Sequence, residues 1–189
     1  MEEIRKYFDG LYQLDDENWE LIGSCFQKTV YKKGEVLLAE GDVCDFVAFV
    51  ESGIFRFFHL KEGDEKISGF FFENDMMSNY PSFTNREPST YYIDCMKDGA
   101  VWKIKKEDMV RLFEESHQLE RLGRLMAERL FAMIVRRLES FVYETPEQRY
   151  QALLAKGSRL IQEIPQYMLA SYVGVSAETL SRIRKRITV

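Results

Sequence analysis

The chain has 189 residues, of which 46% are hydrophobic and 14% aromatic, so it can bury a substantial core and is not expected to be disordered. It has no apolar stretch long enough to span a membrane and no charged-then-apolar leader, so we expect a cytoplasmic protein. The net charge of −5 is unevenly divided, because residues 145–189 hold seven Lys or Arg against three Glu, which leaves −9 on the first 144. A basic segment on an otherwise acidic chain is the electrostatic footprint of a nucleic-acid-binding domain.

The residues that could carry metal or catalytic chemistry are few. Cys25, Cys44 and Cys95 are widely spaced and lack CxxC spacing, which predicts free thiols rather than disulfides, zinc or Fe–S sites. The two histidines, His59 and His117, are too few for the metal site of a cupin-type enzyme, and no Ser-His-Asp or Gly-rich phosphate motif is present. We therefore expect no metal and no enzyme activity, with a cupin-type enzyme as the alternative that metal analysis would test.

The predicted elements begin with a mostly helical segment at residues 3–23. From residue 26, short aromatic and β-branched runs alternate with turn signals about every ten residues, which predicts a small β-roll rather than a parallel α/β sheet. The expected strands are 29–31, 36–38, 46–50, 54–59, 67–72, 91–95 and 101–104, with turns at 33–34, 40–42, 52–53, 62–64 and 98–99.

Two helices are expected next, a short one at residues 107–116 and a long one at 117–143 that would span about 40 Å. The long helix carries two apolar stripes, and such a helix usually has two partners. We expect one partner to be its own β-roll and the other a second copy of the chain in a parallel coiled coil; the alternative is a helix wholly buried in its own domain. The residues assigned to dimerisation are Leu119, Met126, Leu130 and Met133.

The segment from Pro165 to Arg186 reads as two short helices around a tight turn. Apolar residues recur at helical spacing on both sides of Gly174, which can end a helix with φ > 0, and Ser176 is suited to cap the second helix. This pattern predicts a helix-turn-helix, whose second helix enters the DNA major groove; the alternative is a helical hairpin with a solvated basic end. The residues expected to contact DNA are Ser176, Ala177, Glu178, Thr179, Ser181, Arg182 and Lys185.

Three of these residues are spaced so that they share one helix face: Glu178, Ser181 and Arg182. Arg can pair bidentately with guanine and Glu can accept from cytosine N4, so we expect this face to read bases. Ser176 and Lys185 lie nearer the helix ends and are expected to meet phosphates.

The order of β-roll, long helix and helix-turn-helix resembles the Crp/Fnr family of bacterial transcription regulators over nearly the whole chain. The segment YKKGEVLLAEGDVCDFVAFVESGIFRFF is similar to the family's cyclic-nucleotide-binding-like domain, and ETLSRIRKR is similar to its DNA-reading helix. The segment TPEQRYQALLAKGSRLIQEIP resembles a branch of the family common in Bacteroidetes-type bacteria.

The resemblance implies an α+β fold, with an N-terminal β-roll of the jelly-roll or cupin-like kind, flanking helices, a long dimerisation helix and a C-terminal helix-turn-helix. The implied domains are a sensor at 1–116, the dimerisation helix at 117–144 and a DNA-binding domain at 145–189. It also implies a homodimer on double-stranded DNA, at an inverted repeat of TTGA-like half-sites about 34 Å apart. RNA polymerase is a further partner that the resemblance allows.

The chain departs from the family pattern in the sensor pocket. Members that bind cyclic AMP carry a Gly-Glu pair and an Arg-Ser/Thr pair where this chain has Met77-Ser78 and Pro88-Ser89. Arg86 could replace the missing Arg, but nothing replaces the Glu, so we expect no cyclic AMP binding and leave the effector unknown. No cofactor is expected either, because the N-terminal cysteines of an Fnr-type Fe–S cluster are missing. The residues assigned to an effector pocket are Phe71, Met77, Ser78, Arg86, Ser89, Leu122 and Gly123.

A second departure lies at the C-terminus, where the family has a wing hairpin and this sequence stops at Thr188-Val189. Wing contacts to DNA are therefore expected to be absent. Two functional hypotheses remain. The first is a sequence-specific DNA-binding transcription regulator with a degenerate effector pocket. The second is a ligand-binding sensor that acts through protein contacts and has lost DNA binding.

Overall fold

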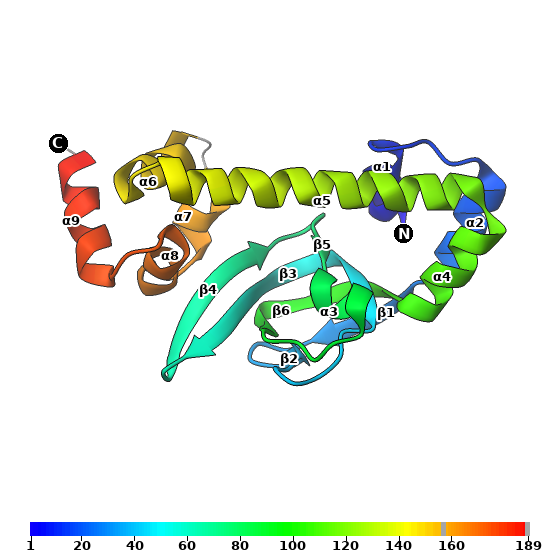
Figure 1. Cartoon of the computed structure of the whole chain (residues 1–189), viewed down its shortest axis with the longest axis horizontal. Coiled ribbons are helices and arrows are strands. Elements are labelled where there is room, and N and C mark those ends of the chain that lie inside the picture. Colours follow the sequence, from blue (N-terminus) through cyan, green and yellow to red (C-terminus); the bar gives the residue numbers. More distant parts are fainter. Residues whose placement is uncertain (156–157, 188–189) are drawn as a thin grey trace. The chain divides into compact units, whose positions relative to one another are not determined.

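The computed structural model describes residues 1–155 and 158–187, and the chain divides into two compact units. Unit 1 comprises Met1–Phe57 and Phe70–Leu130, and unit 2 comprises Phe58–Gly69 and the chain from Phe131 onward. Three elements contribute to both units (Figure 1): the strands β3 (Phe46–Lys61) and β4 (Asp64–Phe71) and the long helix α5 (His117–Tyr143). The bounds of α5 are those predicted from the sequence. Thr188-Val189, on which the expected loss of the wing rests, lies outside the described residues.

An antiparallel sheet forms the centre of unit 1. Its strand order is β1-β6-β3-β4, with β2 paired to β6 and β5 paired to β3. The bounds of the other strands are Gln27–Tyr31 for β1, Val36–Leu38 for β2, Met76–Met77 for β5 and Tyr92–Lys105 for β6. This sheet with its flanking helices confirms the predicted α+β class and the β-roll.

Two of the predicted turns, at 52–53 and 98–99, are wrong, because these residues lie inside the long strands β3 and β6. Gly53 has φ of +92°, and a Cβ on it would lie 2.7 Å from the Gly99 Cα. A Cβ on Gly99 would lie 2.2 Å from the carbonyl oxygen of Ser52. The two backbones therefore touch at this point, and the glycines permit a close approach rather than a reversal of the chain.

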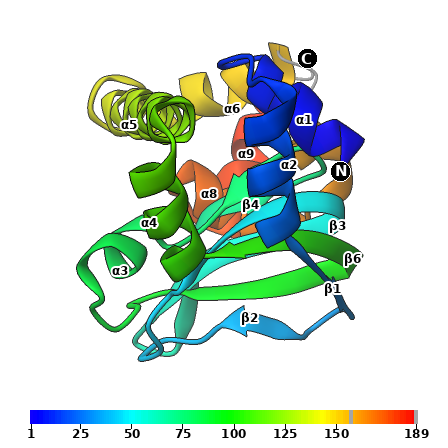
Figure 2. The same cartoon turned by 90° about the vertical axis from the view of Figure 1, so that its right-hand side faces the viewer.

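Four helices described in unit 1 flank the sheet: α1 (Glu2–Asp9), α2 (Asp16–Cys25), α3 (Tyr80–Asn85) and α4 (Lys106–Glu115). Figures 1 and 2 both show α2 and α4 side by side. They share one apolar core with α1 and with the first turns of α5, as the burial of Phe8, Ile22, Leu112 and Leu119 shows. The sequence analysis did not predict α3.

Unit 2 contains the C-terminal half of α5 and four further helices: α6 (Pro146–Ala155), α7 (Arg159–Glu163), α8 (Gln166–Val173) and α9 (Ala177–Ile187). It also contains the tip of the β3–β4 hairpin, where the N–H of Ile67 donates to Ser171 Oγ on α8 at 3.0 Å. Over the described ranges, no helix is long and apolar enough to cross a membrane.

Candidate nucleic-acid interface and sensor pocket

The turn between α8 and α9 is built as the sequence predicts. Gly174 has φ of +87°, and its N–H and that of Val175 both donate to the carbonyl oxygen of Ala170, each at 2.9 Å. Ser176 Oγ accepts from the N–H of Thr179 at 3.2 Å and so caps α9. These contacts confirm the predicted role of Gly174 as the helix end and of Ser176 as the cap.

An apolar seam holds α8 and α9 together. The small side chain of Ala170 is fully buried, which lets the two helices cross closely. The buried side chains of the pair are Met168, Leu169, Ala170, Val173, Leu180 and Ile183. The two helices therefore form one packed pair, which we call the reading head after its expected role, and the remaining face of α9 is left to solvent.

That exposed face carries the residues expected to contact DNA. Ser176, Glu178, Thr179, Arg182 and Lys185 are exposed, while Ala177 and Ser181 are half-buried. Neither Arg182 nor Lys185 makes a hydrogen bond or an ion pair with a described residue.

The other basic residues of α9 have partners within unit 2. Arg184 donates to Gln166 Oε1 at 3.2 Å, and Arg186 forms an ion pair with Glu147 at 2.8 Å. The basic end of α9 is thus divided into cations engaged by the protein and cations directed to solvent. Both members of the second group, Arg182 and Lys185, are among the predicted contacts.

Glu178 is held in its charged form at the start of α9. Its own backbone N–H donates to the carboxylate and lowers its pKa, and the Ser176 hydroxyl and the nearby charge of Arg182 lower it further. A charged carboxylate is the form that can accept a hydrogen bond from cytosine N4. The fully exposed side chain is free to turn toward a base edge.

A buried arginine, which the sequence analysis did not single out, joins the reading head to α5. Arg149 on α6 is only 8% exposed. Its Nε donates to the carbonyl oxygen of Val173 at 2.9 Å, and its Nη1 donates to those of Ser140 at 3.2 Å and of Glu144. One guanidinium therefore satisfies carbonyl groups at the C-terminal ends of both α8 and α5.

A second arginine, Arg137 on α5, reinforces this connection. Its Nη2 donates to the carbonyl oxygen of Tyr172, and its guanidinium lies 3.8 Å from the centroid of the Tyr172 ring. Both cations lie near the ring of Phe141, whose centroid is 4.5 Å from the Arg137 guanidinium and 4.6 Å from that of Arg149. Burial lowers the pKa of Arg137, although the residue remains charged at neutral pH.

In the sensor pocket, the hydroxyl group of Ser89 is fully engaged by the protein. It donates to the carbonyl oxygen of Tyr91 at 2.7 Å and accepts from the N–H of Tyr91 at 3.0 Å and from Asn79 Nδ2 at 2.7 Å. A hydroxyl offers one donor and two acceptor positions, so no position is left for a ligand. The Ser of the family's phosphate-binding pair is present here but is used internally.

The other residues assigned to the effector pocket lie in different environments. Met77, Leu122 and Gly123 belong to the packed interior, where a Cβ on Gly123 would lie 2.4 Å from Phe113 Cζ. Ser78 Oγ donates to the carbonyl oxygen of Phe46 at 2.9 Å. Phe71 is half-buried against Phe57, and Arg86 is exposed at the C-terminal end of α3. No hydrogen bond joins any two of the described residues assigned to this pocket.

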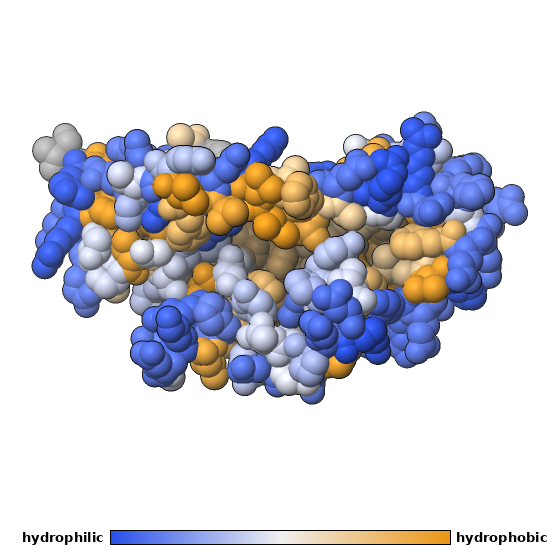
Figure 3. All heavy atoms as spheres, in the orientation of Figure 1, coloured by the Kyte–Doolittle hydropathy of each residue, from blue (hydrophilic) through white to orange (hydrophobic). Residues whose placement is uncertain are grey.

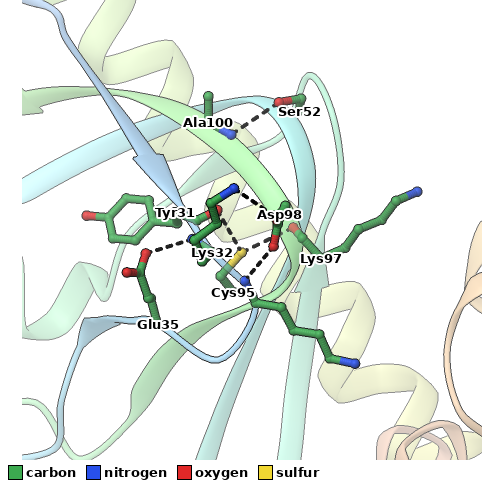
Figure 4. Close-up of polar contacts among 9 residues, drawn as sticks. Tyr31, Lys32, Glu35, Ser52, Cys95, Lys97, Asp98 and Ala100 are labelled. Atoms are coloured by element: carbon green, nitrogen blue, oxygen red, sulfur yellow. Dashed lines mark hydrogen bonds and ion pairs between the residues drawn. The ribbon is translucent and has the colours of Figure 1, made fainter.

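The cysteines carry free thiols, as predicted. Cys95 lies buried in β6, where its thiol donates to the carbonyl oxygen of Lys97 at 3.1 Å (Figure 4). Burial raises the pKa of Cys95 to about 11, so this thiol stays protonated at neutral pH. Among the residues that the structure describes, no group of three or more His, Cys, Asp or Glu could hold a metal ion.

The sequence assigned Leu119 to a dimer seam on α5, but its side chain is fully buried in the core of its own chain. Met126 packs against the same core, whereas Met133 is exposed. Leu130 is half-buried. The same half of α5 carries further exposed apolar side chains, and we call Phe131, Ile134 and Leu138, which are 70%, 53% and 62% exposed, the exposed stripe. Figure 3 shows apolar side chains gathered along this half of α5.

Comparison with known proteins agrees with this architecture. Residues 28–116 match the family model of the cyclic nucleotide-binding domain. Similar solved structures include the catabolite activator protein of Thermus thermophilus, with 23% identity and a TM-score of 0.57 over 96% of this chain and 86% of that one. FixK2 from Bradyrhizobium japonicum has 18% identity and a TM-score of 0.71 over 86% and 84%. The c-di-GMP-responsive regulator CLP of Xanthomonas campestris has 19% identity and a TM-score of 0.67 over 92% of both chains. A comparison with curated protein sequences found no match.

Residues 28–116 are therefore similar to cyclic nucleotide-binding domains. The chain as a whole has the fold of Crp/Fnr-type transcription regulators, which confirms the resemblance predicted from the sequence. The Bacteroidetes-type branch and the domain boundaries at 116–117 and 144–145 remain predictions.

Proposed function

We propose that this protein is a homodimeric, sequence-specific DNA-binding transcription regulator of the Crp/Fnr type, which acts by binding and not by catalysis. The observation that carries the proposal is the pair of exposed cations on α9. Arg182 and Lys185 have no hydrogen-bond or ion-pair partner among the described residues, although other cations of the same helix do. They project from a capped helix in a basic segment of an otherwise acidic chain, where a DNA backbone is the expected counterion.

The proposed readout divides these residues between bases and phosphates. Arg182 pairs with a guanine and Glu178 accepts from a cytosine of a TTGA-like half-site, while Lys185 contacts a phosphate. The sensor domain does not bind cyclic AMP through the family's phosphate-binding pair, because the Ser89 hydroxyl is fully engaged. An effector of other chemistry, if there is one, is unidentified.

Dimerisation is proposed to use the exposed stripe Phe131, Ile134 and Leu138 rather than the seam predicted from the sequence. These residues are spaced by three and four, the spacing of a coiled-coil contact. Large apolar side chains in a continuous exposed row usually mark an interface. A second copy of the chain fits this row because its own row is identical and a two-fold axis pairs like with like.

A selection of genomic DNA fragments by the purified protein tests the DNA-binding proposal, with Arg182→Ala, Lys185→Ala and Arg124→Ala as matched single-charge changes. We expect wild type to enrich an inverted repeat. Arg182→Ala should lose roughly 5- to 150-fold in affinity and relax preference at the guanine, whereas Lys185→Ala should weaken all sequences about equally. Arg124 pairs with Glu128 on α5 and should behave as wild type. Enrichment of no fragment would instead favour the alternative of a sensor that acts through protein contacts.

Sedimentation of Phe131→Glu/Ile134→Glu tests the assembly proposal. Like charges facing each other across the dimer axis should give a folded monomer. The matched variant Met126→Glu places the same charge on the predicted seam, where the side chain packs against its own core, and should reduce stability instead. A dimer that survives Phe131→Glu/Ile134→Glu would show that the exposed stripe is not the interface.

A further inference from the structure

We propose that Arg149 and Arg137 are positioning residues that fix the reading head to α5 and thereby set the spacing between half-sites that the dimer accepts. The inference rests on the proposed function, because it concerns how two heads are presented to DNA. Neither residue lies on the exposed face of α9, and both are engaged by protein groups.

The first argument is the connectivity of Arg149. Its guanidinium bonds at once to carbonyl groups of Ser140 and Glu144 at the end of α5 and of Val173 at the end of α8. The guanidinium is planar and its donors have fixed directions, so three acceptors on two helices fix the relative placement of those helix ends. A Lys at this position keeps the positive charge, but its single ammonium group cannot donate in several fixed directions at once.

The second argument is the kind of group that accepts the hydrogen bonds of the two arginines. The acceptors of both arginines are backbone carbonyl groups at the C-terminal ends of helices, where a cation is also favoured by the helix dipole. Backbone groups cannot change rotamer as a carboxylate side chain can. These hydrogen bonds therefore tie the orientation of α8 directly to the backbone at the end of α5.

The third argument is the contact at the turn. Phe141, which contacts both guanidinium groups, lies so close to Gly174 that a Cβ there would be 2.8 Å from Phe141 Cε1. Gly174 is the residue from which the chain turns into α9. The turn between α8 and α9 is thus packed so closely against the last turns of α5 that no side chain fits at Gly174.

These contacts have a consequence for DNA recognition. The proposed dimer row, Phe131 to Leu138, lies on the same half of α5 as Arg137 and Phe141. A rigid connection from that row to α9 fixes the distance between the two reading heads, whereas heads on flexible linkers accept a range of spacings. Arg137 and Arg149 therefore govern spacing, while Arg182 and Glu178 govern base identity.

The test measures affinity for inverted repeats whose spacers differ by single base pairs, and separately for one isolated half-site. The variants are Arg149→Lys and Arg137→Met, and the control is Arg136→Ala, an exposed neighbour on α5. We expect wild type and the control to prefer one spacer by roughly tenfold over its neighbours. Both variants should reduce this preference to about twofold while half-site affinity changes less than about threefold.

Each outcome is decisive. Wild type that binds no repeat contradicts the proposed function itself. Variants that keep the sharp spacer preference of wild type overturn the positioning role. If both variants also lose half-site binding, the arginines maintain the fold of the head rather than its placement, and the inference is equally overturned.

Discussion

The sensor pocket and the reading head treat their polar groups in opposite ways. At the part of unit 1 assigned to the effector pocket, the buried side chains of Asn79 and Ser89 bond to each other and to the backbone. In unit 2, the exposed Arg182 and Lys185 bond to no described residue. A polar group that is already satisfied by the protein gains little from a ligand, whereas an exposed cation beside a helix face can gain a new partner. The comparison teaches that a family resemblance in sequence does not locate binding capacity, because capacity depends on which donors and acceptors remain available.

The interior of unit 1 also holds two charged side chains, which form a pair. Arg56 and Asp94 are buried and joined by two hydrogen bonds of 2.8 Å, in a bidentate arrangement. A buried pair of this kind has a strong requirement for both partners, because removing one takes two charge-assisted hydrogen bonds from the other in a site that is shielded from water. We therefore expect that neutralising one member of this buried pair lowers the free energy of unfolding far more than neutralising an exposed charge does.

The largest expected effect is that of Asp94→Asn, which leaves Arg56 buried beside a neutral amide. We expect a loss of about 3–5 kcal/mol in the free energy of unfolding, measured by urea denaturation. The matched change Asp98→Asn alters an exposed carboxylate on β6 that pairs with Lys32 in the loop after β1, and should cost less than about 1 kcal/mol. Equal effects of the two substitutions would show that buried charge is not what distinguishes the sensor.

A smaller effect is expected at the turn of the reading head. Gly174→Ala forces a Cβ onto a residue with φ of +87° and toward the Phe141 ring, which should lower the stability of the head by about 1–3 kcal/mol. Gly69→Ala serves as the control, because Gly69 has no positive φ and no atom within 4 Å of the added Cβ. Thermal unfolding followed by circular dichroism compares the two variants. Matching stabilities would mean that the turn tolerates a side chain.

The smallest expected effect is an absence of binding at the sensor pocket. Calorimetry with cyclic AMP at sub-millimolar concentration should show no saturable heat for wild type or for Pro88→Arg. The substitution restores the residue type of the family's Arg-Ser pair, but the Ser89 hydroxyl stays engaged by Asn79 and Tyr91. A micromolar isotherm for wild type would contradict the contrast between the two regions and would implicate Arg86 as a phosphate partner.

Features of this fold that depend on local chemistry could be predicted from the sequence. The bounds of α5 and β2, the left-handed Gly174 and the Ser176 cap all follow from residue types within a few positions of one another. The exposed side chains of α9 followed for the same reason, because the spacing of Leu180 and Ile183 determines which face is buried.

Features that depend on contacts between residues far apart in the sequence could not be predicted. The two apolar stripes of α5 look alike in the sequence, and both turn out to supply core residues, Leu119 from one and Leu122 from the other. The close packing of Phe113 against Gly123 could not be predicted either. The role of Arg149 gave no signal either, because its acceptors are backbone carbonyls and an arginine on a short helix is ordinarily exposed.

The contact between Gly53 and Gly99 has a consequence for how this sequence can change over generations. Their backbones approach so closely that a methyl group on either residue would overlap the main chain of the opposite strand. A clash with a side chain can be relieved by a second substitution, but no substitution removes a backbone atom. Single substitutions at the two positions are therefore not tolerated, and other residues can occur there only if an insertion or deletion moves the strands apart.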